Sequence, residues 1–163
     1  MEEFKQRQKI PLVIILDSIR SLHNVGSIFR TSDAFLIEKI YLCGITSTPP
    51  HAEIHKTALG AENSVDWEYV EDCRLVVKAL KENNYRVYSI EQTENSVMLP
   101  DFTPHSACKA AIVLGNEVKG VQQSVIDICD GSIEIPQYGT KHSLNVSVAA
   151  GIAIWEMALK FKQ

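Results

Sequence analysis

Hydrophobic residues gather in short, β-branched runs that alternate along the chain with longer segments of helical periodicity. The apolar runs predict strands over residues 12–16, 39–43, 65–69, 86–90, 110–114 and 132–135. Most of these runs are continuously apolar, as expected of strands covered on both faces. The alternation therefore predicts an α/β fold, in which a mostly parallel, six-stranded sheet has helices on both faces.

The segments of helical periodicity lie between these runs. They predict helices over about residues 24–35, 72–83, 122–129 and 145–161, with loops at 46–51 and 94–106. Prolines mark both loops, at Pro49 and Pro50 in the first and at Pro100 and Pro104 in the second.

The last predicted helix has apolar residues on every side, namely Val146, Val148, Ala149, Ile152, Ala153, Ile154, Trp155, Met157 and Leu159. Such a helix is expected to be buried all round. Either it lies at the centre of the core, or self-association covers part of it. Four small residues would let a second copy approach closely: Ala149, Ala150, Gly151 and Ala153.

Composition indicates one ordinary domain spanning residues 1–163, since 45% of the residues are apolar and 22% are charged. The formal net charge is −4, which argues against a general polycation that coats nucleic acid. Residues 62–101 carry 9 acidic and 4 basic side chains, a net charge of −5, and the rest of the chain carries +1. A confined basic patch outside residues 62–101 is therefore compatible with the negative net charge of the whole chain.

Cys43, Cys73, Cys108 and Cys129 form no CxxC pair and have no histidine at ligand spacing, so the sequence indicates neither a metal site nor a disulfide framework. The charged N-terminal residues do not lead into the long apolar region of a signal peptide. The most apolar segment, residues 144–159, is shorter than the roughly 20 residues of a membrane span. We therefore expect a cytoplasmic protein without a membrane partner.

Three short stretches carry candidate chemistry. The first contains Asn24, Gly26 and Arg30, after a strand and at the start of a helix. Val25, Ile28 and Phe29 share the apolar face of this helix, and Arg30 points away from it. Its guanidinium could meet a phosphate or a substrate oxygen, or could be a solvated surface cation, and Asn24 could be a helix N-cap.

The second stretch, Leu114 to Gly120, is a glycine-flanked turn after a strand and contains Gly115 and Glu117. Open α/β sheets bind ligands at the carboxyl ends of their strands, so this turn is a candidate site. The chain has neither a GxGxxG motif nor a P-loop, which disfavours ordinary dinucleotide and nucleoside-triphosphate binding. Glu117 could also be a carboxylate in the first turn of a helix, favoured by the helix dipole.

The third stretch runs from Ile135 and Pro136 to Ser143, Leu144 and Asn145, at the start of the apolar helix. Ser143 or Asn145 could cap this helix. Polar groups that enter an apolar segment are costly unless something bonds to them, so a ligand or the opposite loop is the expected partner.

Together the stretches resemble the three motifs of the SpoU (TrmH-like) family of RNA 2′-O-methyltransferases, in the SPOUT superfamily. The first motif, N-x-G-x-x-x-R, matches Asn24, Gly26 and Arg30; the second, G-[NA]-E-x-x-G, matches Gly115, Asn116, Glu117 and Gly120. The third, I-P-x-x-G-x-x-x-S-L-N-V-S, matches Ile135, Pro136, Gly139 and residues 143–147. The resemblance covers nearly the whole chain, in the family's order and spacing.

The resemblance implies a C-terminal deep trefoil knot, a homodimer, and S-adenosylmethionine bound in the knot. The implied cofactor-binding residues are Leu114, Gly115, Ile135, Pro136, Ser143 and Leu144. Arg30 is implied to act on the ribose hydroxyl across the dimer, with Asn24, Glu117, Ser143 and Asn145 holding it and the substrate in place.

The resemblance leaves the RNA substrate open between tRNA and rRNA, with tRNA slightly favoured because the chain is minimal and has no separate RNA-binding domain. Phosphate contacts would then come mainly from Lys5, Arg7, Lys9, Arg20, Lys56, Lys119, Lys141, Lys160 and Lys162. Two other functions compete with this reading: an RNA-binding protein that has lost methyl transfer, and an α/β enzyme with another nucleotide cofactor. Three intact motifs disfavour the first, and the missing phosphate-binding loops disfavour the second.

Overall fold

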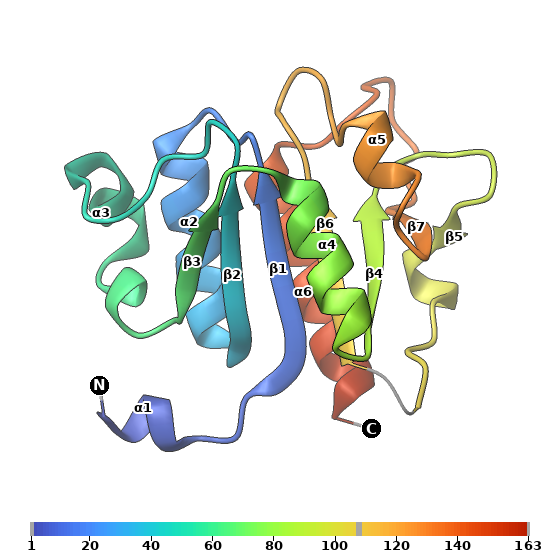
Figure 1. Cartoon of the computed structure of the whole chain (residues 1–163). Helices are drawn as coiled ribbons and strands as arrows, with labels where there is room; N and C mark the ends of the chain where they lie inside the picture. Colours follow the sequence, from blue (N-terminus) through green and yellow to red (C-terminus); the bar gives the residue numbers. More distant parts are fainter. Residues whose placement is uncertain (1, 107–108, 163) are drawn as a thin grey trace.

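The structure, a computed structural model, describes residues 2–106 and 109–162 and is built on a seven-stranded sheet (Figure 1). The strands are β1 (Ile10–Asp17), β2 (Ile37–Cys43), β3 (Trp67–Val70), β4 (Tyr85–Ile90), β5 (Val97–Met98), β6 (Lys109–Leu114) and β7 (Gly131–Glu134). Their order in the sheet is β3-β2-β1-β6-β4-β7-β5, and neighbouring strands are parallel. The carboxyl ends of the strands therefore meet at one edge of the sheet.

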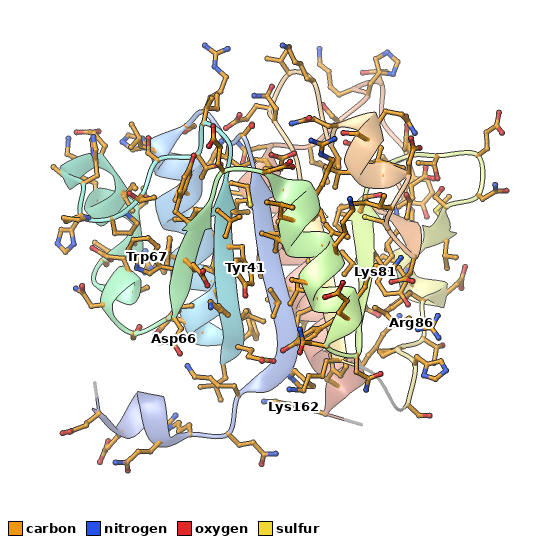
Figure 2. The ribbon with its side chains drawn as sticks, viewed as in Figure 1. Tyr41, Asp66, Trp67, Lys81, Arg86 and Lys162 are labelled. Carbon is orange, nitrogen blue, oxygen red and sulfur yellow. The ribbon has the colours of Figure 1, made fainter. Side chains whose placement is uncertain are left out.

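Helices cover both faces of the sheet. The α-helices are α1 (Glu2–Gln6), α2 (Leu22–Ala34), α3 (Ala52–Ala58), α4 (Cys73–Glu82), α5 (Gln123–Ile126) and α6 (Val146–Phe161), and two 3-10 turns are η1 (Ala61–Asn63) and η2 (Leu99–Asp101). In Figure 1, α4 and α5 lie on the face towards the viewer, and α2 and α6 lie behind the sheet. On the viewer's face, Lys81 of α4 donates to the carbonyl oxygen of Ile128 (2.9 Å), which ties α4 to the segment after α5 (Figure 2).

Alternate side chains of β1 build two cores because successive residues of a strand point to opposite faces. Leu12, Ile14 and Leu16 join the core beneath α2 and α6, and Val13 and Ile15 join the core beneath α4 and α5. Within the sheet β1 pairs with both β2 and β6, and Leu12 is opposite Ala110. The continuous apolar run of β1 follows from this central, doubly covered position.

The sheet has seven strands where the sequence predicts six. The seventh, β5, has only two residues and lies with η2 inside the segment predicted to be a loop. Helix α5 ends at Ile126, three residues before the predicted end, and α3 has no counterpart among the predicted helices. Strand β5 and helix α3 are too short to show a period; β5 is held by pairing with β7, and α3 by packing against α2.

Within one chain, helix α6 is buried on one side only, which contradicts the alternative that it lies at the centre of the core. Ala150, Ala153, Ile154 and Met157 pack into the core of the same chain. The exposed fractions of Val148, Ile152, Trp155 and Leu159 range from 39% to 51%. These four residues, hereafter the α6 stripe, follow one another at helical spacing.

The small residues of α6 lie on both of these sides. Ala150 and Ala153 pack inside the chain, while a Cβ atom on Gly151 would meet no other atom within 4 Å.

The cysteines form no disulfide among the described residues. Cys43, Cys73 and Cys129 are free thiols, and Cys108 lies outside the described residues. Within residues 2–106 and 109–162, every helix is too short or too polar to span a membrane.

Candidate functional site

A cavity of about 290 Å³ opens at the carboxyl ends of β4, β6 and β7. Apolar side chains form part of its wall: Ile90, Leu114, Val118, Ile135, Leu144, Val146 and Ala149. Polar residues and glycines complete it: Glu91, Gln92, Gly115, Asn116, Glu117, Lys119, Gly120, Glu134, Gln137, His142 and Ser143. We call this space the motif cavity, because residues of the second and third motifs line most of it.

The second motif folds into a tight turn at the edge of this cavity. Asn116 and Gly120 exchange backbone hydrogen bonds across the turn, at 3.1 and 2.8 Å. Gly115 is buried below them, and a Cβ atom there would lie 2.2 Å from the backbone nitrogen of Val121. Gly120 has a φ of +70°, which glycine adopts at little cost. Both glycines are therefore required by the turn itself.

Two side chains hold this turn in position. The Oδ1 of Asn116 accepts from the backbone N–H groups of Val118 and Lys119, at 2.9 and 3.0 Å, and its Nδ2 donates to the carbonyl oxygen of Ser18 (2.8 Å). From the other side, Oε1 of Glu91 accepts from the N–H of Val121 (2.8 Å). The turn is thus fixed to the ends of both β1 and β4.

Glu117 connects the second motif to the first. Its carboxylate accepts from the backbone N–H groups of Arg20 (2.9 Å) and Ser21 (3.0 Å) and from Nδ2 of Asn24 (3.2 Å). Burial raises the pKa of Glu117, but these hydrogen bonds outweigh burial and lower the pKa below its usual value. Glu117 therefore remains ionised at neutral pH and orients the start of α2, rather than sitting in the first turn of a helix of its own.

Asn24 also reaches the third motif. Its Oδ1 accepts from Nδ2 of Asn145 at 3.3 Å, and Asn145 is the N-cap of α6. The Oδ1 of Asn145 accepts from the backbone N–H of Ser147 (2.9 Å) and from the Ser147 hydroxyl (2.6 Å). A chain of hydrogen bonds thus runs from Glu117 through Asn24 and Asn145 to Ser147, and it joins all three motifs.

Arg30 stands apart from this chain of hydrogen bonds. It lies on the exposed side of α2, while Val25, Ile28 and Phe29 are buried on the other side as predicted. Arg30 does not line the motif cavity of its own chain. Its guanidinium is therefore accessible to a partner outside the chain.

Gly26 of the first motif has a packing role. A Cβ atom at Gly26 would lie 2.1 Å from Oγ1 of Thr57 and 2.3 Å from the carbonyl oxygen of Ile54. Only a glycine allows α2 and α3 to come this close. The spacing of the motif gave no sign of this contact, because α3 was not among the predicted helices.

The structure brings together most of the residues singled out in the sequence. Leu114, Gly115, Glu117, Ile135, Ser143 and Leu144 line the motif cavity, and Asn24 and Asn145 are hydrogen-bonded beside it. Pro136 and Arg30 are not in the cavity wall. Sequence reasoning missed Glu91 and Gln92, although both directly follow the predicted strand 86–90 and so stand at the same edge of the sheet.

Comparison with known proteins gives a family match over most of the chain. The model of the SpoU rRNA Methylase family matches residues 11–155. The chain is 33% identical over 146 residues to a protein of Neisseria meningitidis serogroup B named 23S rRNA (guanosine-2′-O-)-methyltransferase RlmB. This match covers 90% of the chain but only 57% of that relative.

Solved structures share the fold. The Aquifex aeolicus TrmH/SpoU tRNA modifying enzyme superposes with a TM-score of 0.85 at 26% identity, over 99% of this chain and 82% of that one. An AdoMet-bound rRNA methyltransferase from Sinorhizobium meliloti superposes with a TM-score of 0.83 at 23% identity, over 94% of this chain and 58% of that one.

Proposed function

Because the chain belongs to the SpoU rRNA Methylase family, we propose that it transfers a methyl group from S-adenosylmethionine to a ribose 2′-hydroxyl of a structured RNA. The observation that carries the proposal is the hydrogen-bond chain from Glu117 through Asn24 to Asn145. It brings the three motifs together beside one cavity, as a site requires in which cofactor and substrate must be held in fixed relative positions.

The motif cavity suits the cofactor in size and lining. Its volume of about 290 Å³ is close to the lower end of the roughly 300–1,000 Å³ of small-molecule sites. Apolar walls suit an adenosine ring, and the carboxylates of Glu91 and Glu134 suit the positive charges of the sulfonium and amino groups. When bound, S-adenosylmethionine supplies an electrophilic methyl group on sulfur. Leu114, Gly115, Ile135, Ser143 and Leu144 would hold it, and Pro136 would act by shaping the loop between Ile135 and Gln137.

Arg30 is the proposed catalytic residue. A guanidinium stays protonated in proteins, so we assign it the role of holding the ribose and its phosphate and of stabilising the developing alkoxide, rather than that of a base. Glu117, Asn24 and Asn145 are positioning residues, since they fix the loop before α2 relative to the cavity. Ser143 lines the cavity and would contact the cofactor or the ribose.

Arg30 would act in the cavity of a second copy. Helices α2 and α6 pack against each other, and Phe35 at the end of α2 makes an edge-on ring contact with Trp155 of the α6 stripe. The α6 stripe begins at Val148, in the first turn of α6. The same turn contributes Val146 and Ala149 to the motif cavity. A homodimer that covers the stripe would therefore bring Arg30 of one copy towards the motif cavity of the other.

Exposed cations around the motif cavity support an RNA substrate. Arg20 precedes α2, Lys119 lines the cavity and Lys141 is next to the lining residue His142. Lys160 is not available for phosphate, because its Nζ donates to the carbonyl oxygens of Leu99 (2.7 Å) and Phe102 (2.5 Å). The relatives named above act on tRNA and on rRNA, and we favour tRNA for this chain.

The proposal includes two further features of the family. Residues 1–163 would form one catalytic domain, and its C-terminal segment would thread a deep trefoil knot around the cofactor. We place the reaction in the cytoplasm, in keeping with the free thiols of Cys43, Cys73 and Cys129.

Transfer of labelled methyl from S-adenosylmethionine to total RNA, followed by nucleoside analysis, tests the activity and identifies the modified nucleotide.

Replacing Arg30 by alanine should lower the rate of methyl transfer about 10²- to 10³-fold, because a preorganised donor to the developing oxyanion is lost. Calorimetry should show unchanged cofactor affinity, since Arg30 is outside the cavity wall. Arg30→Lys should rescue poorly, because lysine lacks the planar fork.

A matched control is Arg74→Ala, which removes an arginine from α4 on the other face of the sheet. It should leave the rate near that of the unmodified protein. Near-normal transfer by Arg30→Ala on the true substrate would contradict the catalytic assignment.

A further inference from the structure

A second cavity, of about 600 Å³, opens at the same edge of the sheet but over its other side, among residues at the starts of α4 and α5. Its lining residues are Asp17, Gly44, Val70, Glu71, Asp72, Cys73, Arg74, Leu75, Gln122, Ser124 and Val125. None of them lines the motif cavity. We call this space the α4 cavity.

The α4 cavity occupies the place where open parallel sheets bind ligands. Strands β1 and β6 are neighbours, but the chain leaves them in opposite directions along the sheet. After β1 it continues to β2, and after β6 it continues to β7, beyond β4. Such a divergence leaves a crevice at the carboxyl ends of the two strands. Here Asp17 ends β1, and Gln122 belongs to the segment after β6, so both sides of the crevice contribute to the cavity.

Asp17 is the buried polar group of the α4 cavity. Only 2% of its surface is exposed. Among the described residues, its carboxylate accepts only two long hydrogen bonds, from the Ser18 hydroxyl (3.4 Å) and from Nε2 of Gln122 (3.3 Å). An ionised carboxylate can accept about four, so Asp17 retains unused acceptor capacity.

Within residues 2–106 and 109–162, no cationic side chain forms an ion pair with Asp17. Burial raises the pKa of its carboxyl group, and the negative charge of Asp72 raises it further. The only cation in the cavity wall, Arg74, is paired with Asp72 at 2.8 Å. Glu71 adds another negative charge at the rim. The cavity therefore disfavours phosphates and carboxylates and favours a cation.

The lining also selects the kind of cation. Within the described part of the chain, no three acidic, histidine or cysteine side chains stand close enough together to hold a metal ion. Val70, Leu75 and Val125 instead provide apolar surface in the cavity wall. This arrangement matches a molecule with an aliphatic body and a charged nitrogen that donates hydrogen bonds.

We propose that the α4 cavity is a binding site for a small protonated aliphatic amine, with the ammonium group on the carboxylate of Asp17 and the carbon chain against Val70, Leu75 and Val125. Glu71 meets a second ammonium group at the rim, so a diamine or polyamine binds more tightly than a monoamine. The site does not depend on methyl transfer in the motif cavity.

Titration calorimetry at about 0.15 M salt with spermidine, putrescine and uncharged 1,4-butanediol tests the site. The unmodified chain should bind both amines and not the diol. Asp17→Asn keeps the shape and removes the charge, and it should weaken amine binding at least about tenfold. Without amine, Asp17→Asn should melt at the same or a higher temperature, because no uncompensated buried charge remains.

Glu82→Gln is the matched control, since it removes one acidic charge at the far end of α4. It should bind spermidine as the unmodified chain does. Equal weakening by Glu82→Gln and Asp17→Asn, or undiminished binding by Asp17→Asn, would overturn the proposal in favour of general attraction to an acidic surface. Binding of guanosine in place of amines would assign the cavity to a nucleobase instead. If Asp17→Asn does not fold, Glu71→Gln at the rim provides the same comparison for spermidine.

Discussion

At the scale of single residues, Glu117 joins the second motif to the first through its hydrogen bonds. One carboxylate accepts two backbone N–H groups and one side-chain amide from the segment that opens α2. Residues 18–24, which open α2, have no acidic side chain of their own to accept these hydrogen bonds. The turn that holds Glu117 is fixed by Asn116 and Glu91. The position of Asn24 is therefore set from the second motif.

Replacing Glu117 by glutamine should lower the free energy of unfolding by about 0.5–1.5 kcal/mol, a modest value because water reaches the site. The pKa of Glu117 is lowered in the folded chain, so its contribution is complete above pH 4.5, its usual value, and is lost as the pH falls through the folded value. Urea unfolding of both proteins between pH 3 and 7 should show their stabilities converging at the acid end. Glu94→Gln, a change at an exposed glutamate, should show no such convergence.

At the scale of elements, the contact between α2 and α3 depends on Gly26. Gly26→Ala should lower the free energy of unfolding by about 1–3 kcal/mol, because its Cβ would overlap Thr57 and the backbone of Ile54. Gly139→Ala is the control, since a Cβ there meets nothing within 4 Å. Denaturant unfolding compares the two variants, and equal stabilities would contradict the packing role.

The central strands β1 and β6 could be predicted from the sequence because burial on two faces requires a continuous run of apolar residues. All six predicted strands are present, within two residues at their starts. Helix α3 and strand β5 could not be predicted, because α3 has only two buried residues and β5 only two residues in all. Their structure depends on contacts with α2 and β7, which no local pattern contains.

In the candidate site too, local features could be predicted from the sequence, whereas contacts between distant residues could not. The turn containing Gly115 and Glu117 could be placed at a strand end, and this placement is confirmed. That Glu117 holds Asn24, and that Asn145 holds it from the other side, could not be predicted, since these pairs are far apart in sequence. The roles of the site residues in catalysis and cofactor binding stay predictions.

At the scale of the whole molecule, the α6 stripe is an apolar surface that one copy leaves exposed. Trp155→Glu should convert the proposed dimer into monomers, because a carboxylate would be buried against the partner. Light scattering at micromolar concentration measures the change. Leu75→Glu, at a leucine on α4 that is 58% exposed, should leave the mass unchanged. A monomeric unmodified chain would contradict the dimer.

The pairing of β1 with β6 has a consequence for synthesis on the ribosome. Leu12 leaves the exit tunnel long before Ala110, its partner in the sheet. Until then β1, β2 and β3 can form a sheet in which β1 is an open edge, and the apolar residues of β1 lack the cover that α6 later supplies. The nascent chain therefore exposes an unpaired apolar strand edge during much of its translation. We expect chaperones to bind it most strongly in that interval.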